Sequence, residues 1–358
     1  MDKGVTNMKD YKKLQNGSYI RGVAMPGVEG EAVNLTLQAA ADLAGAFALW
    51  LSEKTGKPVS SLKIAAGRDS RLSGPAIQQI FSEALKAMGA TVYDCGMAST
   101  PAMFMANVFE EIAADGSVMI TASHLPFNRN GIKFFTREGG LGKSDIKALV
   151  KLAEEESFET VSGGSFTCCD LMELYCAHLR KTICDGLGRS EAEKPLSGLH
   201  VAVDAGNGAG GFYVSRVLEP LGADCRGSQF LDSDGTFPNH QPNPENKEAM
   251  QAVCSAVIES GADLGIIFDT DVDRAAAVDS NGKAIDRNAI VALAAMLAAD
   301  GHPGAVIVTD SITSTQLHTF LTDMGMEHLR YKRGYKNVID KGLELNAQGR
   351  DCVLAIET

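Results

Sequence analysis

Residues 121–133 organise the rest of this chain, and they read Thr121-Ala122-Ser123-His124-Leu125-Pro126-Phe127-Asn128-Arg129-Asn130-Gly131-Ile132-Lys133. The apolar residues 116–120 precede them and predict a short buried strand. The proline, asparagine and glycine residues that follow predict an exposed loop, and a second strand restarts at Ile132. Open α/β sheets bind ligands at such strand ends. Ser123 is therefore a candidate nucleophile, and the alternative is an ordinary serine in a surface turn.

A second stretch places three carboxylates at the end of another predicted strand. Residues 263–268 are mostly apolar and run directly into Asp269-Thr270-Asp271-Val272-Asp273-Arg274. Carboxylates this close repel one another unless a cation lies between them, and their hard oxygen atoms favour Mg²⁺ or Ca²⁺. Only three side chains are offered, and the glycine and glutamate of an EF-hand loop are missing. This favours Mg²⁺, which keeps coordination positions open for water or phosphate oxygen atoms. Arg274 suits a phosphate group, and the alternative for the whole stretch is a solvated acidic turn.

Together the two stretches resemble the α-D-phosphohexomutase family of phosphoglucomutases and phosphomannomutases. That family has a Thr-Ala-Ser-His-Asn-Pro loop with a phosphorylated serine, and an Asp-Gly-Asp-x-Asp-Arg metal loop. Leu125 stands where asparagine is usual, and Thr270 stands where glycine is usual. Both departures affect the expected loop geometry and leave the reacting groups intact. The resemblance extends from about Tyr19 onward.

The resemblance implies an α/β protein built from repeated mixed-sheet domains. It predicts a first domain at residues 1–160 with the phosphoserine loop and a second at 161–283 with the metal loop. A third domain, residues 284–358, is expected to be incomplete and to carry a sugar-phosphate loop. The family's fourth domain is absent, so the chain is expected to be C-terminally truncated. In the first domain, periodicity predicts a helix from Glu31 to about Lys54.

The resemblance also assigns roles to individual residues. It makes Ser123 the phosphoserine and a metal ligand beside Asp269, Asp271 and Asp273, with His124 and Lys133 as acid–base groups. The phosphate contacts expected from it are Arg274 and Arg21, and the sugar-phosphate contacts are Lys332, Arg333, Gly334, Tyr335, Lys336 and Glu357. From the residues alone three alternatives stay open. Arg21 fits a salt-bridged surface arginine, Lys133 fits an edge-strand lysine, and residues 332–336 fit a solvated basic turn.

Composition restricts the class of protein. The chain has 358 residues, which is long enough for more than one core. Its formal net charge of −12 argues against nucleic acid or an anionic membrane as the main partner. No apolar run approaches the ~20 residues of a membrane span. Eight cysteines without metal-type spacing predict reduced thiols in a cytoplasmic protein, and we expect a monomer or homodimer.

The function that the resemblance implies is an isomerase of carbohydrate metabolism. A phosphohexomutase of this kind interconverts hexose 1-phosphate and hexose 6-phosphate, with glucose or mannose as the sugar. It uses Mg²⁺, a phosphoserine and a hexose 1,6-bisphosphate intermediate. Three alternatives remain: a phosphoglucosamine mutase, a Mg²⁺-dependent sugar phosphatase, and a non-catalytic sugar-phosphate binder.

Overall fold

The computed structural model describes residues 9–358, so the first eight residues of the expected first domain lie outside the described part of the chain. The protein divides into two compact units, Met1–Lys283 and Ala284–Thr358, which we call the first and second unit. Each is described by itself below.

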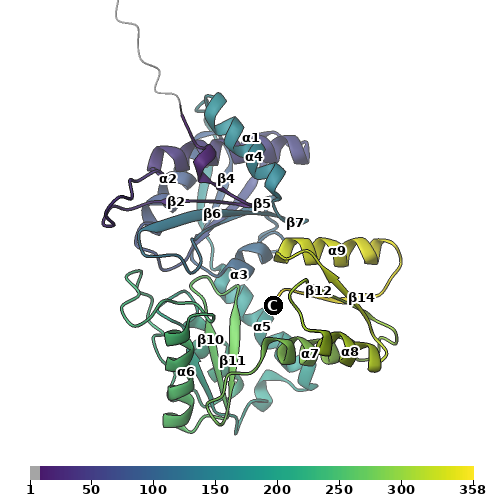
Figure 1. Ribbon diagram of the computed structural model, residues 1–358. Helices are drawn as coiled ribbons and strands as arrows, with labels where there is room; N and C mark the ends of the chain where they lie inside the picture. The colour runs from purple at the N-terminus through teal and green to yellow at the C-terminus, as the bar shows by residue number, and fades with distance from the viewer. Residues whose placement is uncertain (1–8) are drawn as a thin grey trace, which may run out of the picture. The chain divides into compact units, whose positions relative to one another are not determined.

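The first unit contains an eight-stranded mixed sheet (Figure 1). Its strand order is β1-β2-β6-β5-β3-β4-β8, and β7 pairs with β6. The strands are β1 (Gln15–Asn16), β2 (Tyr19–Val23), β3 (Lys63–Arg68), β4 (Thr91–Met97), β5 (Gly116–Ile120), β6 (Arg129–Thr136), β7 (Gly139–Gly140) and β8 (Ser165–Cys168). Strands β5 and β6 are antiparallel neighbours, so the loop predicted between them connects two central strands. The predicted start of β6 at Ile132 was wrong: the strand begins at Arg129, because residues 129–131 pair with β2.

Helices cover both faces of this sheet because its central strands are buried on both sides. One face packs Ile120, Ile132 and Phe134 against α1 (Leu37–Thr55), α2 (Gly74–Ala87) and α4 (Lys143–Glu155). The other face packs Met119 and Phe135 against α3 (Thr100–Met105) and α5 (Leu171–Leu187). Adjacent residues thus alternate between two separate cores, as strand geometry requires.

Helix α1 begins at Leu37, six residues later than the periodicity predicts. The side chain of Asn34 accepts a hydrogen bond of 2.7 Å from the Val23 amide, which ties the preceding segment to β2. Thr36 then caps the helix by accepting from the Ala39 amide at 3.1 Å. The prediction of the helix start was therefore wrong because a long-range contact competes with the helical pattern.

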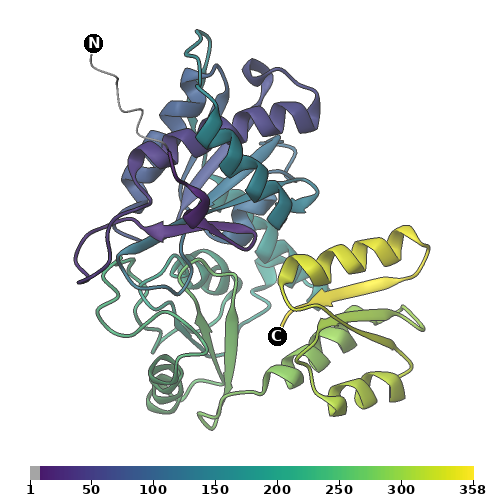
Figure 2. The same ribbon diagram turned by 45° about the horizontal axis from the view of Figure 1, so that its top comes forward.

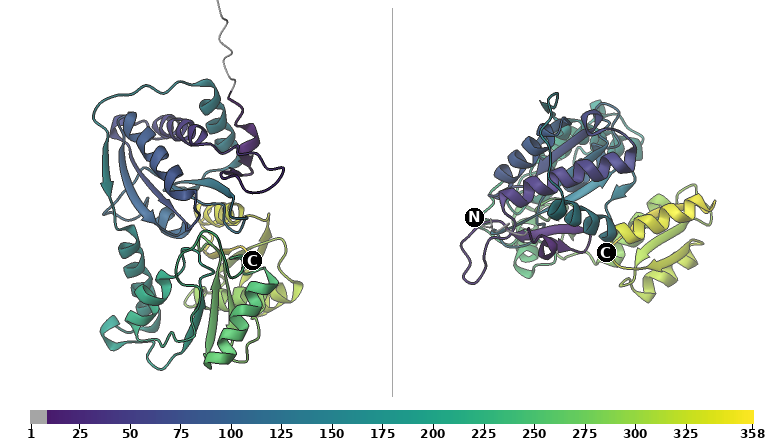
Figure 3. Two further views of the ribbon diagram at one scale, coloured as in Figure 1. Left: turned by 90° about the vertical axis from the view of Figure 1, so that its left-hand side faces the viewer. Right: turned by 90° about the horizontal axis from the view of Figure 1, so that it is seen from above.

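A second sheet of the first unit has the order β11-β10-β9, formed by β9 (Val201–Asp204), β10 (Leu264–Phe268) and β11 (Ala275–Asp279). Strands β9 and β10 are parallel, whereas β10 and β11 are antiparallel. Helix α6 (Lys247–Ser260) packs along this sheet (Figure 3). The short helical turns of the first unit are Lys12–Leu14, Val59–Ser61, Glu191–Glu193, Val214–Leu218 and Glu219–Leu221.

The second unit is a parallel three-stranded sheet with helices on both faces (Figure 2). Its strands are β12 (Val306–Asp310), β13 (Glu327–Tyr331) and β14 (Cys352–Ile356), in the order β13-β12-β14. Helices α7 (Arg287–Ala298) and α8 (Thr315–Asp323) pack on one face, and α9 (Tyr335–Ala347) packs on the other. The predicted α/β class is confirmed. In the described residues no helix is both long and apolar enough to span a membrane.

Candidate active site

Ser123 lies in the loop between β5 and β6, with its residue 3% exposed. Its amide donates to Thr121 Oγ1 at 2.8 Å, which closes a tight turn directly after the strand. Its φ angle is +52°, a left-handed conformation that is uncommon for a residue with a Cβ atom. Such conformations persist when the surrounding structure holds them and are frequent at functional sites.

Arg71 holds this loop in place, and sequence reasoning did not single it out. Its guanidinium is fully buried and donates to the backbone carbonyl oxygens of Ser123, Leu125, Pro126 and Arg129. Asp69, also fully buried, lies 3.4 Å from Arg71 Nε. Burial raises the pKa of Asp69 to about 6, although the charge of Arg71 opposes this shift. The sequence did offer one indication of this role: Arg71 is the second arginine of the turn at residues 67–71, which directly follows a predicted strand.

The carboxylate loop, residues 269–274, connects β10 to β11. The side chain of Asp269, its first residue, stabilises the loop by hydrogen bonds to the loop's own backbone. Asp269 Oδ1 accepts from the amides of Asp273 and Arg274, each at 3.1 Å. Val272 takes the left-handed conformation with a φ of +62°. Thr270 does not take it, so the threonine in place of the family's glycine creates no strain of this kind.

The two loops meet although they are 146 residues apart in sequence. Ser123 Oγ donates to Asp269 Oδ2 at 2.8 Å and accepts from Arg274 Nη2 at 2.5 Å. The same arginine nitrogen donates to His124 Nδ1 and contacts Asp269 Oδ2 at 3.0 Å. Burial, together with repulsion from the neighbouring carboxylates, raises the pKa of Asp269 well above its usual value.

Lys133 forms ion pairs with the other two carboxylates of the loop. Its Nζ lies 2.6 Å from Asp271 Oδ2 and 2.5 Å from Asp273 Oδ2, and the residue is 3% exposed on the central strand β6. It is therefore not an edge-strand lysine. Burial alone would raise the pKa of Asp271, but Lys133 and a hydrogen bond from Thr100 outweigh it and hold this pKa at about 2. The sequence did not predict a role for Thr100. Besides its side-chain contact with Asp271, its amide donates a hydrogen bond to the Asp271 carbonyl oxygen at 2.8 Å.

The carboxylate loop fits a hard divalent cation. One oxygen atom from each of Asp269, Asp271 and Asp273 lies within 4.8 Å of the others. Asp269 and Asp271 are fully buried, which excludes a solvated turn for these two side chains. Asp271 Oδ1 is buried and accepts no hydrogen bond from the described residues. Unpartnered carboxylate oxygen is what a hard cation requires as a ligand.

His124 and Arg21 are predicted site residues with different surroundings. Burial, and then the charges of Arg274 and Arg21, lower the pKa of His124 to about 4, so its ring is neutral near pH 7. Arg21 lies on β2 opposite Gly131 of β6, with its guanidinium 5.2 Å from the centre of the Tyr19 ring. Its charge is thus directed at the site, although no ion pair of Arg21 occurs among the described residues.

Two further segments support the loops. A Cβ atom on Gly208 would lie 2.7 Å from the Thr270 carbonyl oxygen, so only glycine permits this backbone contact with the carboxylate loop. Gln241 Nε2 donates to the His124 carbonyl at 2.6 Å. Next to it, the His240 ring lies 3.0 Å from Asp204 Oδ2, and both residues are buried.

The predicted sugar-phosphate contacts lie together in the second unit. Glu357 Oε1 accepts from the Gly334 amide at 3.0 Å and lies 3.8 Å from Arg333 Nε. Tyr335 begins α9, and Lys336 pairs with Asp340 one turn later at 2.8 Å. Lys332 Nζ lies 5.9 Å from the centre of the Tyr331 ring. The basic loop and the C-terminal glutamate therefore form one cluster at the start of α9.

Comparison with known proteins identifies the family. Residues 20–160 match the family model for phosphoglucomutase/phosphomannomutase α/β/α domain I, and residues 173–282 match that for domain II. A phosphomannomutase/phosphoglucomutase from Pseudomonas syringae pv. tomato is 33% identical over 273 residues, covering 76% of this chain and 56% of that protein. A phosphomannomutase from Salmonella montevideo is 32% identical over 320 residues, covering 84% of this chain and 68% of that protein.

A solved structure agrees with these matches. The phosphoglucomutase/phosphomannomutase family protein from Burkholderia thailandensis superposes with a TM-score of 0.77 at 28% identity, covering 93% of this chain and 68% of that one. The chain spans little more than half of the length of the first curated relatives that it matches. The matched region covers 57% of one relative and 56% of another. By sequence, fold and motif, the chain belongs to the phosphoglucomutase/phosphomannomutase family of α-D-phosphohexomutases.

Proposed function

We propose that this chain carries the phosphoryl-transfer site of a phosphohexomutase that interconverts hexose 1-phosphate and hexose 6-phosphate. The observation that carries the proposal is the position of Ser123 Oγ, 2.8 Å from Asp269 and 2.5 Å from Arg274. A buried hydroxyl between a carboxylate and a guanidinium is a site where a phosphate ester can be made and broken.

In the proposed reaction, Ser123 carries the phosphoryl group at the start of each cycle. The bond between Ser123 Oγ and phosphorus breaks while a hydroxyl oxygen of the hexose phosphate bonds to the same phosphorus. Neutral His124 is the proposed base for the proton of that hydroxyl, which it would accept on Nδ1 in exchange for the hydrogen bond from Arg274. Arg274 and Lys133 are positively charged and reduce the negative charge that builds on the transferring group.

The product of this first step is a hexose 1,6-bisphosphate. It returns its other phosphate to Ser123 by the reverse chemistry, which leaves the isomeric monophosphate. We assign the contacts with the sugar phosphate to the cluster of residues 332–336 and Glu357. Glucose and mannose phosphates are the proposed substrates, and glucosamine phosphate is the alternative.

The carboxylate loop is proposed to hold Mg²⁺ through Asp269, Asp271 and Asp273, with a phosphate oxygen on Ser123 as a further ligand. A bound ion would supply positive charge to the phosphoryl group. The support from this chain is the unpartnered Asp271 Oδ1 and the exclusively oxygen-donor character of the three side chains.

Phosphorylation of Ser123 is the first test. After incubation with glucose 1,6-bisphosphate, intact-mass analysis should find one added phosphate, and peptide mapping should place it on Ser123. Ser123→Ala should remain unmodified. The control is Ser70→Ala, because Ser70 is also buried and its hydroxyl has no hydrogen-bond partner in the described residues. Phosphate on another residue, or on the Ser123→Ala variant, would refute the proposal.

Phosphorus NMR separates the mutase from its alternatives. With glucose 1-phosphate, mannose 1-phosphate or glucosamine 1-phosphate, a mutase produces the corresponding 6-phosphate, and the relative rates identify the sugar. A phosphatase instead releases inorganic phosphate without isomerised sugar. A binding protein perturbs the ligand resonance without any turnover, and either result would exclude the mutase.

A further inference from the structure

Two cysteines meet at the free edge of the first sheet. Strand β8 is the last strand on that side and pairs in parallel with β4, with Asp94 opposite Cys168 (Figure 3, left). The ladder continues for one more step, because the Cys169 amide donates to the Asp94 carbonyl at 2.8 Å. Cys95 and Cys169 are therefore the next pair of neighbours on the two strands.

The two thiols lie on the same face of the sheet. Cys95 is 7% exposed within the core beneath α3 and α5, and Cys169 packs against that core from its edge. The Cys95 thiol donates to the Tyr93 carbonyl oxygen at 3.8 Å. Neighbouring strands hold opposed Cα atoms roughly 5 Å apart, within the range of roughly 4.4–6.8 Å that a disulfide requires. All eight cysteines of the chain are nevertheless free.

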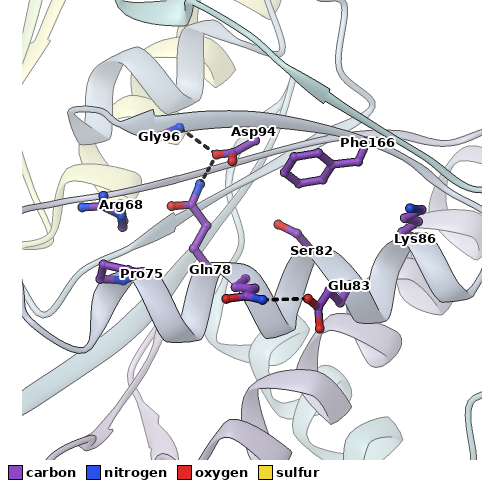
Figure 4. Close-up of a pocket in the computed structure, with 10 residues that line it drawn as sticks. Arg68, Pro75, Gln78, Ser82, Glu83, Lys86, Asp94, Gly96 and Phe166 are labelled. Carbon is purple, nitrogen blue, oxygen red and sulfur yellow. Dashed lines mark hydrogen bonds between the residues drawn. The ribbon is translucent and has the colours of Figure 1, made fainter.

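Strand β4 is fixed from the opposite face. Asp94 Oδ1 accepts hydrogen bonds from Gln78 Nε2 at 2.5 Å and from the Gly96 amide at 2.9 Å (Figure 4). Both residues beside Cys95 are thereby anchored, which fixes the backbone of β4 at this position. A cavity of about 500 Å³ on this opposite face is lined by Asp94 of β4 and Phe166 of β8.

The two thiols differ in reactivity. Cys169 is partly exposed, whereas Cys95 is buried. The neighbouring Cys95 thiol lowers the pKa of Cys169 to about 7, although burial opposes this shift. The neighbouring Cys169 thiol and burial raise the pKa of Cys95 far above its usual value. Because the thiolate is the nucleophile, Cys169 is the thiol that reacts first.

We propose that Cys95 and Cys169 form a dithiol site that hydroperoxides oxidise to a disulfide. The Cys169 thiolate attacks one oxygen of the peroxide, which breaks the O–O bond, gives a sulfenic acid on Cys169 and releases hydroxide or alkoxide. The Cys95 sulfur then attacks the Cys169 sulfur, forming the S–S bond and releasing water with the Cys95 proton. The two thiols are oxidised by two electrons, and the peroxide is reduced by two.

The disulfide would close a loop over residues 96–168 and fasten the edge strand to the sheet. Strand β8 is short and its four residues are exposed, and α5 begins two residues after Cys169. The bond would therefore fix the point at which the chain leaves the first sheet. A cross-link across a long loop stabilises the folded protein mainly by restricting the unfolded chain.

Peptide mapping of the full chain tests this proposal. After treatment with hydrogen peroxide, alkylation and digestion with trypsin without reduction, residues 87–129 should be linked to residues 152–180. Fragmentation should place the link between Cys95 and Cys169, and the melting temperature should rise by several degrees and fall again with dithiothreitol. Cys168→Ser is the matched control, because Cys168 is the exposed neighbour of Cys169, and it should keep the link.

The variants identify the order of the two steps. Cys95→Ala, checked for a native circular-dichroism spectrum, should lose the link and leave a sulfenic acid on Cys169 that dimedone traps. Cys169→Ser should show neither product. A bond between Cys168 and Cys169, a bond to Cys176, or a wild-type protein that remains unlinked in excess peroxide would each overturn the proposal.

Discussion

The replacement Arg71→Met tests whether one buried arginine supports the serine loop. It removes a guanidinium that donates to four backbone carbonyls, and it leaves Asp69 buried without its positive partner. Removal of one partner from a buried ion pair costs about 3–5 kcal/mol. Since single domains are stable by about 5–15 kcal/mol, we expect the free energy of unfolding to fall by about 3–5 kcal/mol with the fold retained.

Urea unfolding followed by tryptophan fluorescence measures this change in the first unit. The chain has one tryptophan, Trp50. It stacks on Phe47 with 6.3 Å between the ring centres and packs against the core beneath α1, α2 and α4. The matched control is Arg68→Met, since Arg68 makes one side-chain hydrogen bond, to the Asp69 carbonyl, among those in the described residues. Its loss should cost about 0.5–1.5 kcal/mol.

A double-mutant cycle separates the ion pair from the loop contacts. Asp69→Asn combined with Arg71→Met should recover at least about 1 kcal/mol relative to the sum of the single variants, because the buried carboxylate is then neutral. The reasoning is refuted if Arg71→Met costs no more than the Arg68 control, or if the two replacements are additive.

Three further predictions concern the carboxylate loop and its supports. Millimolar Mg²⁺ should raise the melting temperature of the chain, and Asp271→Asn should reduce this rise at least by half; a melting curve indifferent to Mg²⁺ would contradict the cation site. Asp204 raises the pKa of His240 although burial opposes it, so this histidine stabilises the fold fully below ~6.5 and loses the contribution as pH rises through the folded pKa. Accordingly, His240→Asn should cost more stability at pH 5.5 than at pH 8.5, and denaturant midpoints showing an equal cost would count against the ion pair. Gly208→Ala should cost about 1–3 kcal/mol by displacing the carboxylate loop, whereas Gly186→Ala, on an open helix face, should be neutral or stabilising in the same calorimetric measurement.

Local pattern was sufficient to predict the strand that leads into each of the two central loops, whereas the fold class was implied by the resemblance to the phosphohexomutase family. An apolar run followed by turn residues predicts a strand and then a loop, and β5 and β10 each lead into such a loop. Two details of the serine loop were wrong: Ser123 and Asn128 are buried, and β6 starts at Arg129 because this residue pairs with β2. Pattern was not sufficient for β8, because an exposed edge strand of four residues lacks the alternation that identifies a strand. It also placed the start of α1 too early, since the competing partner of Asn34 lies eleven residues away.

The chemical groups at the strand ends of this protein are predictable without a structure: a serine, three carboxylates and the basic residues near them. These depend only on residue types and their spacing along one segment. The partners of these groups come from the folded chain: Ser123 contacts Asp269, Lys133 lies between Asp271 and Asp273, and Arg71 donates to the backbone of the serine loop. Each of these contacts joins residues from different segments, so it exists only after the sheets have packed. The physical reason is that a side chain's partners, and hence its charge and reactivity, depend on burial and distance in three dimensions.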